Sequence, residues 1–153
     1  DLLDRLAMKT SARNQFSTQV VELVDRGGVV DVVLGLGGLG GQDSGGPRLI
    51  ATITPESVEN LELRPGSEVF ALIKAPVVQI TTTAPRRLAG RNVLAGPITA
   101  LRPGEHRTGV TLGLPGERSL HAVLDRHKAA ALTVGQSVWA AFSGDQVVLV
   151  TFT

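Results

Sequence analysis

Hydroxyl and cationic side chains recur at three places in the first half of this sequence, in a combination that suits a tetrahedral oxyanion. Ser11 and Arg13 stand just before a predicted strand and offer a hydroxyl and a guanidinium fork. Thr54 and Ser57 lie at the start of a predicted helical turn, where free N–H groups and the helix dipole attract negative charge. Lys74 interrupts an apolar run at 69–80, and a lysine buried there costs several kcal/mol unless an anion pairs with it. Arg13 and Lys74 would together balance a dianion.

Each of these groups also has a simpler explanation. Arg13 can be a surface charge, and Lys74 can reach solvent from the end of a strand. Thr54 and Ser57 can be an ordinary helix N-cap, with Pro55 at the first helical position. The residues taken one at a time therefore leave the choice open.

Motifs typical of enzymes and cation sites lack their required context. The glycine-rich stretch at 35–40 fits a dinucleotide pattern, but no helix is predicted after it. Residues 43–47 copy the letters around a protease serine, but no histidine precedes Ser44. His106, His121 and His127 lack the spacing of metal ligands and are predicted to be surface or half-buried side chains. The sequence thus predicts no enzyme, no bare metal cation and no organic cofactor.

Composition favours one small all-β protein. The 153 residues are 42% hydrophobic, with 18 glycines, no cysteine and a net charge of +1, which disfavours a nucleic-acid-binding surface. No apolar run is long enough for a membrane span, so a soluble cytoplasmic protein is expected. Strands are predicted at 16–24, 29–36, 48–54, 68–82, 96–101, 108–114 and 119–124, with helical turns at 55–61 and 126–131.

The two halves of the chain repeat one another. The pair Arg13-Asn14 recurs as Arg91-Asn92. Gly66 precedes the apolar run at 69–73 by the same spacing as Gly135 precedes the run at 138–142. Two copies of about 70 residues predict an internally duplicated small barrel. Residues 1–9 suit a short helix, either as a frayed end or as a connector from a domain upstream.

Several segments closely resemble the molybdate-binding domain known as Mop or TOBE. These segments are residues 11–15, 53–57, 61–66 and 73–76. The resemblance implies two tandem five-stranded OB-like barrels with short helical turns. It divides the chain into a helical connector at 1–9, an oxyanion-binding repeat at 10–83 and a degenerate repeat at 84–153.

The resemblance also implies a ligand and its contacts. Molybdate or tungstate would be bound at the interface of a homodimer. The residues that match the family's ligands are Ser11, Ala12, Arg13, Thr54, Ser57, Lys74 and Ala75, of which Ala12 and Ala75 would offer backbone N–H groups. In the second copy Ala89 replaces the serine, Ser143 replaces the lysine, and Leu124 and His127 are expected near the Thr and Ser positions.

Three kinds of parent protein use such units. The degenerate second copy and the leucine-bearing segment at 1–9 favour the ligand-sensing half of a molybdate-responsive transcriptional regulator, whose DNA contacts would come from an absent N-terminal winged-helix domain. The alternative is a duplicated molbindin that stores molybdate. A regulatory domain of a transporter ATPase is a third class, but the sequence has no phosphate-binding loop to support it.

Overall fold

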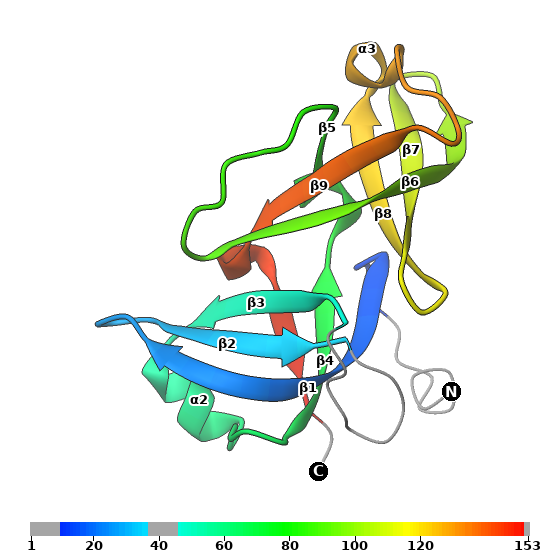
Figure 1. Ribbon diagram of the computed structural model, residues 1–153. Helices are drawn as coiled ribbons and strands as arrows, with labels where there is room; N and C mark the ends of the chain where they lie inside the picture. The colour runs from blue at the N-terminus through cyan, green and yellow to red at the C-terminus, as the bar shows by residue number, and fades with distance from the viewer. Residues whose placement is uncertain (1–9, 37–45, 152–153) are drawn as a thin grey trace.

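The computed structural model describes residues 10–36 and 46–151, and within them strands are the main secondary structure (Figure 1). The predicted helix at 1–9 and most of the glycine-rich stretch, including Ser44, lie outside the described residues. The first half contains β1 (Asn14–Asp25), β2 (Val30–Gly35), β3 (Arg48–Ile53), α2 (Pro55–Asn60), β4 (Glu68–Ile73), η1 (Ala75–Val77) and β5 (Gln79–Thr81). The second contains β6 (Arg91–Pro103), β7 (Arg107–Leu114), β8 (Arg118–Asp125), α3 (Arg126–Ala129), β9 (Ser137–Ser143), η2 (Gly144–Gln146) and β10 (Val148–Val150).

These strands form two five-stranded antiparallel sheets that each curl into a half-barrel, which confirms the predicted all-β class. One sheet has the order β10-β4-β1-β2-β3 and the other β5-β9-β6-β7-β8. The two halves of the sequence thus fold into matching units, lower and upper in Figure 1.

The halves exchange one strand each. β5 leaves the first half and pairs with β9, while β10 returns from the second half and pairs with β4. In Figure 1, β5 lies in the upper unit and the red end of the chain, which holds β10, lies in the lower unit. Because each sheet is completed by the other half of the sequence, neither half forms all five strands from its own residues.

Local sequence explains how the first sheet is shaped. Side chains of β1 alternate between buried and more exposed up to Val20, where a bulge interrupts the register with β2. The β1–β2 hairpin closes through two glycines with positive φ, Gly27 and Gly28. The carboxylate of Asp25 accepts a 2.8 Å hydrogen bond from the Gly27 N–H.

A single core joins both halves. Phe16 and Val32 from the first half belong to the same cluster of buried apolar side chains as Ile98, Leu120 and Phe142 from the second. This continuous core, together with the exchanged strands, fixes the two units to one another. No helix in the described part of the chain is long and apolar enough to cross a membrane.

Candidate functional site

The segment before β1 holds three of the predicted site residues. Ser11 and Arg13 are exposed, whereas Ala12 between them is buried. The Ala12 N–H donates a 3.1 Å hydrogen bond to the Thr10 hydroxyl, and the Gln15 side-chain amide donates to the Ala12 carbonyl at 3.2 Å. Ser11 and Arg13, on either side of Ala12, line the same cavity.

Lys74 is not buried inside a strand, so of the two alternatives that the sequence left open the structure shows the exposed lysine at a strand end. β4 ends at Ile73, and Lys74 is the exposed N-cap residue of η1. Pro76 explains the break, because proline lacks the N–H that a continuing strand would donate and fits the start of a helical turn. The predicted strand at 68–82 is therefore divided into β4, η1 and β5. An exposed ammonium group does not require an anion to offset desolvation.

The register of β1 with β4 brings Lys74 next to the Ser11–Arg13 segment. Asn14 pairs with Ile73, so the residues that flank this pair, Arg13 and Lys74, lie at the same end of the two strands. Ala75 follows as the buried first residue of η1. Five of the seven predicted ligands, namely Ser11, Ala12, Arg13, Lys74 and Ala75, are thus gathered in one place.

A cavity of about 270 Å³ lies beside this cluster, between the two halves of the molecule. Its lining takes in Ser11, Arg13 and Ala75 from the first half. The second half contributes residues of β6, β7 and β8 that the sequence had not singled out as ligands: Arg102, Gly109, Val110, Thr111, His121, Ala122 and Val123.

His121 is half-buried in this lining, as the sequence had predicted for the histidines in general terms. Its Nδ1 lies 3.1 Å from the Thr111 hydroxyl. Burial, and then the positive charges of Arg13 and Arg102, lower the pKa of His121 below its usual value of 6.5. The cavity therefore has an electropositive wall built from both repeats.

Asn14 and Asn92 hold the junction between the halves together. The buried Asn14 carboxamide donates 2.8 Å to the His121 carbonyl and accepts 2.7 Å from the His121 N–H. Asn92 makes the same pair of bonds with Ile50, at 2.9 Å and 2.7 Å. The sequence showed the repeated Arg-Asn pair as a sign of duplication, but the role of its asparagines was missed.

Thr54 and Ser57 lie elsewhere. Thr54 is the N-cap of α2, where its hydroxyl accepts from the Ser57 N–H at 3.1 Å and donates to the Ser57 hydroxyl at 3.0 Å. Ile53, which precedes Thr54, pairs with Val30 at the hairpin end of β1, whereas the Ser11–Arg13 segment lies at the other end (Figure 1). The predicted helix and its cap are confirmed, but one chain does not bring the two groups of predicted ligands together.

The structure also corrects the predicted counterparts in the second repeat. Asp125, not Leu124, is the N-cap of α3, so it stands where Thr54 stands in α2. Lys128, not His127, occupies the third helical position that Ser57 holds. Ser143 is the N-cap of η2, as Lys74 is of η1, which agrees with the predicted replacement. The second repeat thus has a carboxylate where the first has the Thr54 hydroxyl.

Comparison with known proteins supports two copies of one domain in tandem. The TOBE domain profile matches residues 10–80 and again 88–149. The chain is 39% identical to the molybdenum transport protein ModE of Azotobacter vinelandii, over 99% of this chain and 54% of that protein. It is 34% identical to the DNA-binding transcriptional dual regulator ModE of Escherichia coli, over 97% of this chain and 55% of that protein.

Other similar proteins have different names. The molybdenum-pterin-binding protein MopA of Rhodobacter capsulatus is 33% identical over 94% of this chain and 53% of its own length. A crystal structure of the cytoplasmic molybdate-binding protein ModG, with molybdate bound, superposes with a TM-score of 0.81 at 33% identity. That likeness covers 93% of this chain and 98% of ModG, and it confirms the predicted tandem OB-like architecture. The chain spans about half the length of the curated relatives it matches.

Proposed function

The chain belongs to the TOBE domain family, with two copies in tandem, and on this basis we propose that it binds molybdate or tungstate as the ligand-sensing part of a transcriptional regulator. The observation that carries the proposal is the gathering of Ser11, Arg13 and Ala75 around one cavity, with Lys74 at the adjoining strand end. A dianion leaving water needs many hydrogen bonds and close to two positive charges. Arg13 and Lys74 supply the charges, and the Ser11 hydroxyl and the Ala75 N–H supply further donors. The Ala12 N–H joins them once it leaves the Thr10 hydroxyl, to which it donates in this structure.

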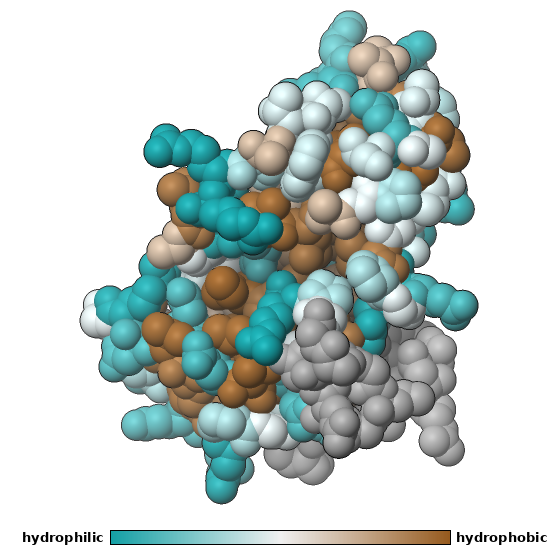
Figure 2. Space-filling model, in the orientation of Figure 1, coloured by the Kyte–Doolittle hydropathy of each residue, from teal (hydrophilic) through white to brown (hydrophobic). Residues whose placement is uncertain are grey.

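A second copy of the chain would complete the site. Thr54 and Ser57 match family ligands but lie at the far end of β1 from Ser11. In a two-fold dimer the hydroxyls of one copy can meet the cationic cluster of the other, and the same contact repeats by symmetry. This arrangement gives one anion per chain. Figure 2 shows apolar surface in the waist between the two units, as expected for a face that a second copy covers.

The second repeat favours sensing over storage. Asp125 and Ser143 replace a hydroxyl and a cation, which would leave that copy unable to balance a dianion. A storage protein gains capacity from every competent site, whereas a sensor needs only one site coupled to a change of shape. In this reading the protein is cytoplasmic, catalyses no reaction, and contacts DNA through a domain outside this chain.

Similarity to MopA and ModG supports the alternative, a molybdate-storing molbindin. The two functions differ in what lies upstream in the parent gene. A winged-helix domain preceding Asp1 supports the regulator, whereas a start codon at or near Met8 supports storage.

The ligand itself is tested by calorimetry of the purified chain with molybdate, tungstate and sulfate. We expect saturable binding of the first two at one anion per chain and much weaker binding of sulfate, which is smaller. Absence of binding to both larger anions would refute the proposed function for either kind of parent protein.

A further inference from the structure

The cavity beside Ser11 and Arg13 has a rear wall that belongs to the second repeat. We propose that Arg102 and His121 form part of the anion site and that His121 takes up a proton when the anion binds. This inference rests on the proposed function, and it assigns a direct role in ligand binding to the repeat whose own site is degenerate.

His121 is held in place by contacts from its own chain. Asn14 fixes its backbone through two hydrogen bonds, and Asn14 directly follows Arg13. Thr111 holds the Nδ1 side of the ring at 3.1 Å, which leaves Nε2 on the far side of the ring from that hydroxyl. The backbone that carries the imidazole is thus tied to Asn14, the residue next to Arg13.

The matching junction in the other half is filled with a different set of groups. Asn92 binds Ile50 there, so a side chain that cannot ionise stands in the place of His121. We call the contact of Asn14 with His121 the first junction and the contact of Asn92 with Ile50 the second. The strand registers show that Asp31 at the second junction is equivalent to Gly109 at the first, and that Thr52 is equivalent to Val123.

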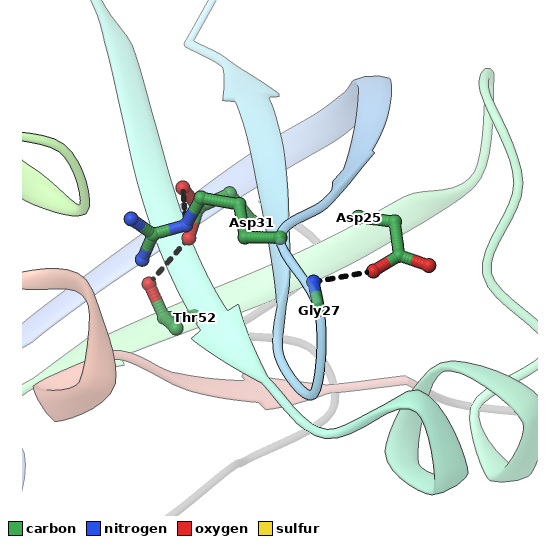
Figure 3. A network of polar contacts seen from close by, with 5 residues as sticks. Asp25, Gly27, Asp31 and Thr52 are labelled. Carbon is green, nitrogen blue, oxygen red and sulfur yellow. Dashed lines mark hydrogen bonds and ion pairs between the residues drawn. The ribbon is translucent and has the colours of Figure 1, made fainter.

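An ion pair occupies that second junction (Figure 3). Arg26 Nε lies 2.9 Å from the Asp31 carboxylate, which also accepts 2.7 Å from the Thr52 hydroxyl. The fit is tight, because a Cβ built on Gly144 would lie only 2.6 Å from Thr52 Oγ1. The second junction therefore carries its own carboxylate, already paired with Arg26 and Thr52, whereas no carboxylate of the described residues lines the cavity at the first.

The charges facing His121 all have the same sign. Arg13 approaches from the segment before β1 and Arg102 from β6, while β7 contributes Gly109, Val110 and Thr111 and η1 contributes Ala75 and Pro76. No carboxylate is among the described residues that line the cavity. The positive charge of this wall disfavours a proton on His121 when the cavity holds only water. An anion bound in the cavity would neutralise that charge and so favour the proton.

The direction of the pH effect follows from this arrangement. Burial and the two guanidinium groups lower the pKa of His121 in the free protein. A bound dianion attracts the imidazolium and raises that pKa. The added affinity is fully present below the free pKa and disappears as the pH rises through the bound pKa. Each unit of difference between the two corresponds to about a tenfold change in affinity.

The test is calorimetry of the whole chain with micromolar sodium molybdate in buffers of different ionisation enthalpy. Near neutral pH the wild type should take up a fraction of a proton per anion, and its affinity should rise several-fold from about pH 8 to about pH 6. His121→Gln should remove both effects while leaving the backbone bonds to Asn14 in place. His106→Gln is the matched control, because His106 is exposed and outside the cavity.

A second measurement follows His121 directly by NMR titration. Its pKa should rise when molybdate is added, and Arg102→Gln should raise it in the free protein while weakening molybdate binding. Tight molybdate binding with no proton uptake, or an unchanged pH profile in His121→Gln, would overturn this inference and leave the proposed function standing. No molybdate binding by the wild type at any pH would overturn both.

Discussion

The carboxamide of Asn14 forms one donor and one acceptor hydrogen bond with the backbone of His121, 107 residues further along the chain. Because Asn14 adjoins Arg13, this contact ties the start of the first sheet to the wall of the cavity in the second. Asn92 and Ile50 repeat it with the roles of the halves reversed. Two equivalent contacts, which we call clasps, therefore join the halves of the duplicated fold: Asn14 with His121 and Asn92 with Ile50.

Removing a clasp should destabilise the protein. Asn14→Ala leaves the part-buried N–H and carbonyl of His121 without their partner and removes a buried bond to the Ile73 carbonyl, so we expect a loss of about 2 kcal/mol in the free energy of unfolding. Asn92→Ala should have a similar effect through Ile50. Gln15→Ala is the control, since Gln15 is less buried than Asn14 and its side chain makes one hydrogen bond to the described residues, at 3.2 Å, where Asn14 makes three. Urea unfolding measures all three, and a loss in Asn14→Ala no larger than in Gln15→Ala would contradict the role of the clasp.

Lys74 should contribute to binding but not to stability. Its side chain is exposed, so Lys74→Ala is expected to leave the unfolding midpoint nearly unchanged. Loss of a charged hydrogen-bond partner costs about 1.5–3 kcal/mol, which predicts molybdate affinity weaker by roughly tenfold to a hundredfold. Arg91→Ala, at the equivalent of Arg13 in the second repeat, should change it little. Equal affinity in wild type and Lys74→Ala, measured by calorimetry, would remove this residue from the site.

A single substitution can give α2 of the first repeat the same N-cap residue as α3 of the second. Thr54→Asp keeps a good N-cap for α2 but places a carboxylate where Asp125 stands in α3. We expect little change in stability and a loss of molybdate affinity of at least about tenfold, through charge repulsion. Thr54→Asn keeps the cap without the charge and should bind better than Thr54→Asp. Equal binding by these two variants would show that the start of α2 does not face the anion.

The separation of Thr54 from Lys74 gives a complementation experiment for the dimer. Thr54→Asp and Lys74→Ala chains should each bind poorly as homodimers. When the two are mixed and allowed to exchange, a heterodimer has one site with both defects and one intact site. We therefore expect recovery of high-affinity binding at about half a site per heterodimer chain. No recovery, despite heterodimer formation seen by native mass spectrometry, would contradict a site shared between copies.

Gly144 should tolerate no side chain. Its added Cβ would meet Thr52 Oγ1 at 2.6 Å and two carbonyl oxygens at 3.0 Å, so Gly144→Ala is expected to cost about 1–3 kcal/mol of stability. Ala75 occupies the equivalent position in the first half beside the cavity, and a methyl group is accommodated there. Thermal unfolding of Gly144→Ala indistinguishable from wild type would show that the second junction is looser than the structure indicates.

Local signals in the sequence predicted the elements well. Pro55 after a threonine predicted the start of α2, and Asp25 with two glycines predicted the first hairpin, because these residues act on their own immediate backbone. The family resemblance singled out the Ser11–Arg13 segment and Ala75, and the structure brings Ser11, Arg13 and Ala75 to one cavity.

Features that depend on contacts between distant segments could not be predicted from the sequence. The exchange of β5 and β10 depends on pairing between distant segments, which a strand's own residues do not specify. The sequence left open whether Lys74 is buried or exposed, because the apolar run at 69–80 predicts one strand that continues across Pro76. Arg102 and His121 carry no local motif, and only the packing of the second repeat against the first brings them to the cavity.

The central claim is that one dianion binds per chain, on ligands of the first repeat. Isothermal titration of the purified chain with molybdate tests it most directly, with the protein concentration fixed independently and Lys74→Ala measured alongside. The account predicts one anion per chain, two per dimer, and a marked loss of affinity in the variant. Two equal sites per chain, or no saturable binding, would contradict it.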